Sequence, residues 1–203
     1  MDRNKTTKKS GKLLRNTGCK RHRCTWIVPL TAVLIGYLLL TISGCGTIEK
    51  SSESVEPVKG IFAFKRAVEQ AAFTDFEGDT VSVTDFKGKV IMIDFWETWC
   101  KPCTNSFPGL NKLQEKYSDD FVVLAVTPGF ADDADDARDF AEDHDYRFTY
   151  LLDSGNVHKR LGIDRIPYKL FLDPKGQFTG SSIGSEGPEH DYEKIMKIIE
   201  REL

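Results

Sequence analysis

The hydrophobic residues in the second half of the chain occur in short continuous runs. Two of these, VIMIDFW at residues 90–96 and FVVLAVT at residues 121–127, are apolar at almost every position. A strand covered on both faces shows this pattern, whereas a half-exposed strand alternates apolar and polar residues. We therefore expect two central strands here, and further strands at residues 148–153, 168–173 and 177–183.

Segments with helical periodicity separate these strands. Apolar residues recur every three or four positions within residues 102–117, 131–144 and 192–203. Upstream, residues 71–89 hold two short alternating segments around Glu77-Gly78-Asp79, which predicts an N-terminal hairpin. Strands that alternate with helices predict an α/β sandwich, with helices on both faces of one central mixed sheet.

The first 48 residues have the pattern of an export signal. Residues 1–24 hold nine Lys or Arg and one acidic residue, and residues 25–48 carry no charge. The apolar stretch ends in the sequence ISGC at residues 42–45, which resembles the lipobox of bacterial lipoproteins, whose cysteine is acylated after cleavage. We therefore expect a signal peptide at residues 1–44 and a lipid anchor at Cys45. The alternative is an uncleaved membrane helix, for which the apolar stretch is long enough.

Removal of the signal makes the remaining protein strongly acidic. The whole chain has a net charge of -3 and residues 1–44 carry +8, so residues 45–203 are near -11. This charge, without a basic patch, excludes nucleic acid as an expected partner. Residues 45–59 predict a lipid anchor and a polar tether, and residues 60–203 suffice for one domain with its own core. Either form of the N-terminus holds this domain to the membrane on the extracytoplasmic side, periplasmic or at the cell surface.

Two cysteines lie three positions apart in the sequence Trp99-Cys100-Lys101-Pro102-Cys103, directly after the first central strand. Thiol exchange needs one thiolate to attack and a second thiol to resolve the mixed disulfide. At a helix start, unpaired N–H groups and the helix dipole favour the thiolate of Cys100, and the charge of Lys101 adds to this effect. Pro102 is tolerated there, because an N–H in the first turn has no helical partner to lose. We expect an exposed, nucleophilic Cys100 and, one turn further, a resolving Cys103.

A zinc site and an inert structural bridge are the alternatives for this pair. Zinc usually has four ligands, but with Cys45 acylated the mature chain offers one cysteine pair and three scattered histidines. We expect these histidines at the surface or at helix ends: His144, His158 and His190. A bridge across two intervening residues closes a very small loop and restrains little chain entropy. Redox chemistry, with no metal and no other cofactor, is therefore favoured.

The motifs around the cysteines resemble those of the thioredoxin superfamily. The sequence DFW at residues 94–96 precedes WCKPC, Pro108 follows it, and IP at residues 166–167 comes after further strands and helices. The hairpin, the sequence FKGKVIMIDFWETWC and the insertion at residues 121–152 resemble the extracytoplasmic TlpA/ResA-like branch, over about residues 71–203. The resemblance implies a thioredoxin-like fold and a membrane-tethered thiol-disulfide oxidoreductase. It also implies an electron donor in the membrane and a substrate disulfide in an exported protein, such as an apocytochrome in cytochrome c maturation.

The resemblance also assigns the second half of the site. In this family the proline that faces the cysteine pair follows a cis peptide bond, and the residue before it offers backbone groups to a substrate chain. This implies these roles for Pro167 and Ile166; an ordinary loop proline before a strand is the alternative. Tyr168-Lys169 departs from the small hydroxyl residues common after this proline, so we expect an altered substrate groove. The other expected substrate-binding residues are Trp99, Lys101 and Pro102.

Asp94 indicates the direction of the reaction. Strand alternation places it on the face of Met92 and Trp96, which predicts a buried carboxyl beneath the cysteine helix, without a cationic partner and with a raised pKa. Such a group can take a proton from Cys103 when this thiol attacks the mixed disulfide. The acid at this position and Ile166 resemble thioredoxin itself, which implies a reductant. An Asp that caps a neighbouring turn is the alternative.

Two other function classes remain open at this stage. A thiol peroxidase on the same fold typically has Thr three residues before its attacking cysteine, and Glu97 occupies that position here. A redox-inert binding module would have little use for both cysteines. The sequence therefore favours the oxidoreductase.

Overall fold

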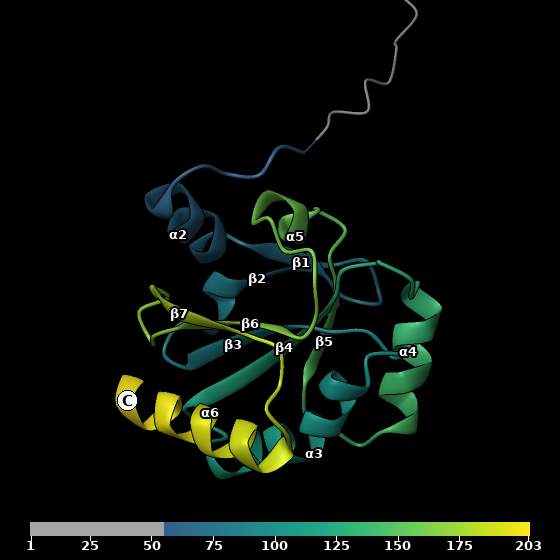
Figure 1. The fold of residues 1–203 in the computed structure, drawn as a ribbon, viewed down its shortest axis with the longest axis vertical. Helices are drawn as coiled ribbons and strands as arrows, with labels where there is room; N and C mark the ends of the chain where they lie inside the picture. Colours follow the sequence, from purple (N-terminus) through teal and green to yellow (C-terminus); the bar gives the residue numbers. More distant parts are fainter. Residues whose placement is uncertain (1–54) are drawn as a thin grey trace, which may run out of the picture. The chain divides into compact units, whose positions relative to one another are not determined.

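The described part of the protein, residues 55–203 of a computed structural model, is built around one seven-stranded sheet (Figure 1). The strands are β1 (Ala72–Thr74), β2 (Thr80–Ser82), β3 (Val90–Phe95), β4 (Phe121–Thr127), β5 (Thr149–Leu152), β6 (Tyr168–Leu172) and β7 (Phe178–Ile183). The helices are α2 (Ile61–Glu69), the 3-10 helix η1 (Val83–Phe86), α3 (Lys101–Lys116), α4 (Ala134–Asp143), α5 (Val157–Arg160) and α6 (Pro188–Glu202). Within this part of the chain, no helix has both the length and the apolar character needed to cross a bilayer. The predicted signal and Cys45 lie outside the described residues.

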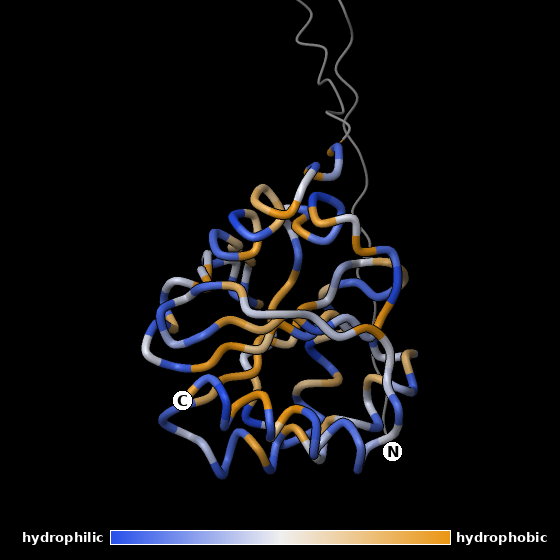
Figure 2. Tube along the Cα trace, turned by 60° about the vertical axis from the view of Figure 1, so that its left-hand side comes forward, coloured by the Kyte–Doolittle hydropathy of each residue, from blue (hydrophilic) through white to orange (hydrophobic). Residues whose placement is uncertain are grey.

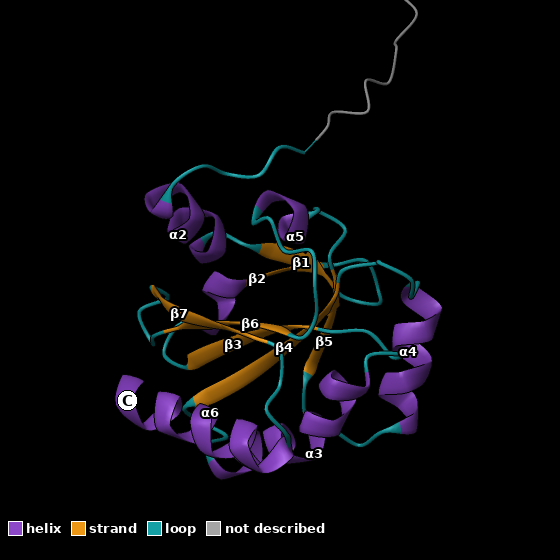
Figure 3. Ribbon diagram, viewed as in Figure 1, coloured by secondary structure: helices purple, strands orange, loops and turns teal. Residues whose placement is uncertain are grey.

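The sheet is mixed, with the strand order β2-β1-β5-β4-β3-β6-β7. The three neighbours β3, β4 and β5 are parallel, and all other neighbouring pairs are antiparallel. Helices cover both faces of the sheet, α2 and α5 on one side and α3 and α6 on the other (Figure 3). The predicted α/β sandwich and its N-terminal hairpin, β1 and β2, are therefore confirmed.

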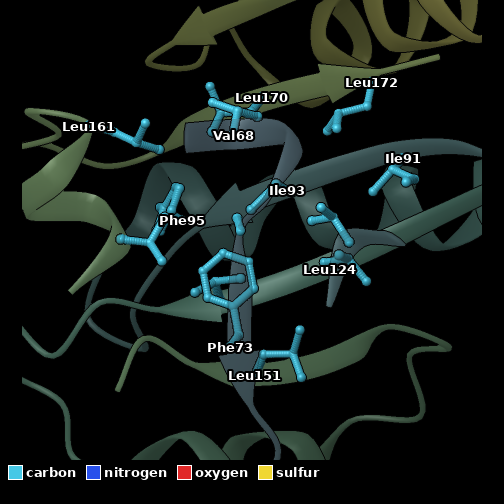
Figure 4. Packing of buried hydrophobic residues seen from close by; sticks show 14 of the residues in the cluster. Val68, Phe73, Ile91, Ile93, Phe95, Leu124, Leu151, Leu161, Leu170 and Leu172 are labelled. Atoms are coloured by element: carbon cyan, nitrogen blue, oxygen red, sulfur yellow. The ribbon is translucent and has the colours of Figure 1, made fainter. Parts of the chain in front are cut away.

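The central strand β3 separates two apolar cores, because its side chains alternate between the two faces of the sheet. Ile91, Ile93 and Phe95 belong to a core that includes residues of α2 and of the hairpin (Figure 4). Met92 and Trp96 belong to a second core, beneath α3 and α6. Apolar residues follow the central strands and the inner sides of the helices (Figure 2). The second core is the one that holds the cysteine pair.

Two short helices, α2 and α5, are absent from the sequence-based prediction. The helix α2 has nine residues; it buries Ala67 and Val68 and exposes Ile61 and Phe62. The helix α5 has only four residues, and the carboxylate of Asp153 accepts backbone N–H groups at its start. Both helices add to the core on the side of the sheet opposite the cysteines.

Candidate active site

Cys100 and Cys103 form a disulfide at the N-terminus of α3, with 5.3 Å between their Cα atoms. Cys100 is the N-cap residue, and its carbonyl oxygen accepts the N–H groups of Cys103 at 2.9 Å and Thr104 at 3.0 Å. Pro102 lies in the first turn, where the sequence placed it. The expected exposure of Cys100 is wrong, because only 3% of its surface is accessible in the disulfide, and Cys103 is fully buried. In the disulfide form, Cys100 therefore keeps a small accessible area, and Cys103 has none.

Two tryptophans near the disulfide lie in different environments. Trp96 is fully buried in the second core and packs edge-on against Phe107, with 5.0 Å between ring centroids. Trp99, directly before the disulfide, is 55% exposed. Trp96 is therefore part of the core that contains the cysteine pair, and Trp99 is available to a docking partner.

Ile166 and Pro167 lie at the same edge of the sheet as the cysteine pair. The register of β3 and β6 pairs Phe95 with Tyr168, so the chain enters β6 through Pro167 where it leaves β3 towards Cys100. The peptide bond between Ile166 and Pro167 is cis, as the resemblance implied. Ile166 is half-buried and packs against the core that contains both cysteines.

Asp94 lies between the sheet and the cysteine helix, and it has a cationic partner. It is fully buried, and its Oδ1 is 3.3 Å from Nζ of Lys169, the residue directly opposite it on β6. Within residues 55–203, neither group has a partner in hydrogen-bond geometry, so the contact is a bare ion pair. Burial raises the pKa of Asp94; the charge of Lys169 opposes this effect, and Asp191 of α6 adds a smaller rise.

The expected environment of Asp94 is therefore right in its burial and its raised pKa but wrong in lacking a cation. Of Tyr168 and Lys169, the two residues expected to alter the substrate groove, Lys169 has its side chain buried against Asp94. The sequence did not predict the pairing of Asp94 with Lys169, although the position of each residue within its strand could have indicated it. Each residue is a single charge in an otherwise apolar strand.

Glu97 is a further site residue, which the sequence analysis considered only as the absence of a threonine. Its side chain is fully buried beneath the loop between β4 and α4. Its carboxylate accepts the indole N–H of Trp99 and the backbone N–H groups of residues 130–132. A buried carboxylate is tolerated when several N–H groups replace its lost hydration. An acidic residue between an apolar strand and the cysteines was the available signal.

Two of the three histidines lie at the surface or at a helix end, and the third, His158, lies in the first turn of α5 but is buried. His158 is buried, and its Nδ1 lies 2.6 Å from Oδ2 of Asp153. His190 is exposed on α6, and His144 follows the last residue of α4. Within residues 55–203, no three His, Cys, Asp or Glu side chains are grouped as ligands of a metal ion.

Comparison with known proteins places this arrangement in a family. A family model described as the AhpC/TSA family matches residues 64–180, which is more than half of the chain. The chain belongs to the AhpC/TSA family.

The chain is similar in sequence to a thiol-disulfide oxidoreductase and to a thioredoxin-like protein. The chain is 33% identical over 127 residues to the thiol-disulfide oxidoreductase ResA of Bacillus cereus (strain ATCC 10987), which covers 62% of this chain and 72% of that protein. It is 34% identical over 119 residues to the thioredoxin-like protein YneN of Bacillus subtilis (strain 168), covering 58% of this chain and 70% of that protein.

Solved structures show the same fold. A putative thiol:disulfide interchange protein DsbE of Chlorobium tepidum is 30% identical with a TM-score of 0.56, covering 64% of this chain and 90% of that one. The exposed lipoprotein thioredoxin of Streptococcus pneumoniae strain TIGR4 is 25% identical with a TM-score of 0.55, covering 65% of this chain and 98% of that one. This AhpC/TSA family member has a thioredoxin-like fold. It is a thiol-disulfide oxidoreductase, and its Cys100 and Cys103 form a disulfide across two intervening residues.

Proposed function

We propose that the protein reduces disulfides in exported proteins, with Cys100 as the nucleophile and Cys103 as the resolving thiol. The observation that carries this proposal is the Cys100–Cys103 disulfide at the start of α3, the helix on the same side of the sheet as the buried carboxyl of Asp94. Cys100 is the residue with some access to solvent, whereas Cys103 is closed off by the helix. A client sulfur can therefore approach Cys100 before it can approach Cys103.

The electrons pass in two exchange steps. In the reduced protein the Cys100 thiolate attacks one sulfur of the client disulfide; that S–S bond breaks, and the client's other sulfur leaves as a thiolate and takes a proton. The Cys103 thiolate then attacks the Cys100 sulfur of the mixed disulfide, which forms the Cys100–Cys103 bond and releases the second client thiolate. The client gains two electrons, and the protein is oxidised to the disulfide state of the structure. A membrane dithiol donor is needed to return it to the dithiol.

Asp94 is proposed as the proton acceptor for Cys103. A carboxyl with a raised pKa holds or accepts a proton closer to neutral pH than an ordinary aspartate does. The charge of Lys169, 3.3 Å away, favours the carboxylate form of Asp94, which burial alone would disfavour. The half-buried Ile166 and the cis-bonded Pro167 supply the backbone edge along which a client segment lies. Lys101 and Pro102 complete the rim of the site at the first turn of α3.

We further propose that residues 1–44 are a signal peptide, that Cys45 is a lipid anchor, and that residues 45–59 tether a domain formed by residues 60–203. The basic and then apolar N-terminus and the sequence ISGC support this proposal. One structural neighbour is an exposed lipoprotein thioredoxin. The domain would then act on the extracytoplasmic side of the membrane, on exported proteins such as apocytochromes awaiting haem.

Two assays on the full chain test the proposed activity against the thiol peroxidase alternative. With a dithiol as electron source, the protein is expected to accelerate the reduction of insulin disulfides and to leave hydrogen peroxide consumption at the background rate. Peroxide consumption without insulin reduction would establish the peroxidase instead. Inactivity in both assays would establish a redox-inert module.

A further inference from the structure

One buried carboxylate, that of Glu97, holds both the side chain of Trp99 and the backbone of the loop that carries Phe130. Trp99 is 55% exposed and Phe130 is 40% exposed, although most large apolar residues are buried. The indole N–H of Trp99 donates to Oε2 of Glu97, and the backbone N–H of Phe130 donates to Oε1 of the same residue. The carbonyl oxygen of Glu97 accepts the N–H of Cys100 at 3.0 Å. Trp99 and the loop that carries Phe130, 31 positions apart in sequence, are therefore held against the same short segment, residues 97–99, which leads into Cys100.

The position of Glu97 is fixed, because both oxygens of its carboxylate accept hydrogen bonds. Its Oε2 also accepts the N–H groups of Ala131 at 3.0 Å and of Asp132 at 3.4 Å. The carboxylate of Asp132 in turn accepts the N–H of Thr98. The loop at residues 130–132 is thus hydrogen-bonded to both Glu97 and Thr98, in the segment that precedes the disulfide. The Trp99 ring is held through its own N–H, and the Phe130 ring packs edge-on against the ring of His158, with 5.2 Å between centroids. Aromatic side chains held in place lose less conformational entropy when they bind a partner.

The surface next to Phe130 is acidic. A hollow of about 200 Å³ lies beside it, lined by residues 127–129, 132–134 and 152–154. Asp132 and Asp133 are among the residues that line it, and Asp135 and Asp136 follow in the first turn of α4. In a mature chain with a net charge near -11, this region favours a partner with positive charge.

We propose that Trp99, Phe130 and the acidic hollow form the docking surface for client polypeptides, and that they select a segment with an apolar residue next to its cysteine and a basic residue nearby. The proposal rests on the proposed reduction of protein disulfides. A client sulfur must come within bonding distance of Cys100, so the residues beside the client cysteine come close to Trp99, the neighbour of Cys100, and to the loop that carries Phe130. Aromatic side chains at the centre of a contact contribute most of its binding energy, and opposite charges around it set the specificity.

Glu97 is the positioning residue of this surface. It does not contact the client; it orients Trp99 and the loop at residues 130–132. Its loss is therefore expected to raise KM for a preferred client while kcat changes little. A general structural defect would lower kcat as well.

The test uses the full chain and two synthetic peptides, each carrying one cysteine as a mixed disulfide with glutathione. One peptide has Leu before and Lys after the cysteine; the other has Ser before and Glu after. We expect kcat/KM for the first to exceed that for the second by about 10-fold, a typical effect of one anchoring side chain. Phe130→Ser is expected to reduce this ratio to about 2 through KM. The matched control Phe62→Ser, at an 82% exposed phenylalanine on α2, is expected to keep it.

The outcomes separate this proposal from the proposed function. If neither peptide is reduced, the reductant function itself fails. If both are reduced equally, or if Phe130→Ser keeps the preference, the docking surface is wrong and the reductant function stands. Self-association of the wild type that Phe130→Ser abolishes, with an unchanged peptide preference, would assign the surface to a second copy of this chain and overturn the proposal. Glu97→Gln supplies the second variant: an unchanged KM for the preferred peptide contradicts the positioning role.

Discussion

Asp94 and Lys169 face each other across neighbouring strands, 3.3 Å apart and almost completely shielded from solvent, on the side of the sheet that packs against α3. They come from the two strands whose ends carry the cysteine pair and the cis proline. A buried ion pair is weak as a source of stability, because the desolvation of both charges offsets their attraction. The role that we expect for the pair is therefore in proton transfer and not in stability. Its effect on stability and its effect on the resolution step can be measured separately.

The first prediction concerns stability. Lys169→Met is expected to lower the free energy of unfolding at pH 7 by about 3–5 kcal/mol, because it leaves Asp94 without its cation. The pKa of Asp94 is raised in the folded protein, so the stability that it contributes is complete below its unfolded pKa of about 3.9 and is lost as pH rises through its folded pKa. The defect is therefore expected to shrink as pH falls towards 4. Denaturant titrations at several pH values measure this trend.

The matched control removes both charges. Asp94→Asn combined with Lys169→Met is expected to be at least as stable as the wild type, and up to about 4 kcal/mol more stable, because no buried charge remains. If the double variant is as unstable as Lys169→Met alone, packing and not charge explains the loss.

The second prediction concerns the resolution step. Asp94→Asn is expected to slow the attack of Cys103 on the mixed disulfide by about 100-fold, the usual range for loss of a general base, and to slow formation of the mixed disulfide much less. In the wild type, the rate of resolution is expected to rise with pH as Asp94 loses its proton. In Lys169→Met this rise is expected at a higher pH, because the loss of the cation raises the pKa of Asp94 further. Stopped-flow kinetics resolve the two phases. An unchanged resolution rate in Asp94→Asn would remove Asp94 from the mechanism.

The third prediction concerns the order of attack. Cys103→Ser is expected to accumulate disulfide-linked adducts with its clients, because the mixed disulfide can form but cannot be resolved. The adducts are expected to disappear when Cys100 is replaced as well. Non-reducing gels followed by identification of the captured proteins reveal the clients. Adducts that persist without Cys100 would reverse the assignment of the two thiols.

The fourth prediction concerns the reduction potential. Equilibration of the Cys100–Cys103 pair with glutathione is expected to give a value nearer thioredoxin's, about -270 mV, than that of the strong oxidant DsbA, about -120 mV. The thioredoxin-like Asp94 and Ile166 favour the lower value, and the charge of Lys101 opposes it. A value near that of the oxidant would mean that the protein forms disulfides in its clients.

The fifth prediction concerns the anchor. Cys45→Ser is expected to leave the precursor unprocessed or to release the domain from the membrane, because no acyl chain can be attached. Fractionation and the size of the mature chain measure both outcomes. Unchanged processing and retention would contradict the lipoprotein proposal and favour an uncleaved membrane helix.

Local patterns in the sequence were enough to predict much of the fold. The continuous apolar runs became β3 and β4, and the helical period after the cysteines became α3, within one residue at each end. The face of Asp94 also followed from the sequence, because neighbouring side chains on a strand point to opposite sides. These properties depend on residues close together in the chain, so their physical causes are visible in the sequence.

The partners of the site residues were decided only by the tertiary structure. Lys169 reaches Asp94 because β6 pairs with β3 in one register, and a shift by one residue would have turned its side chain to the other face. Glu97 meets residues 130–132 only where the chain returns after β4. The sequence by itself determined which residues form the strands, the helix and the thiol pair. The folded structure determined which charges are desolvated together, because desolvation depends on everything that packs around a group and not on its neighbours in the chain.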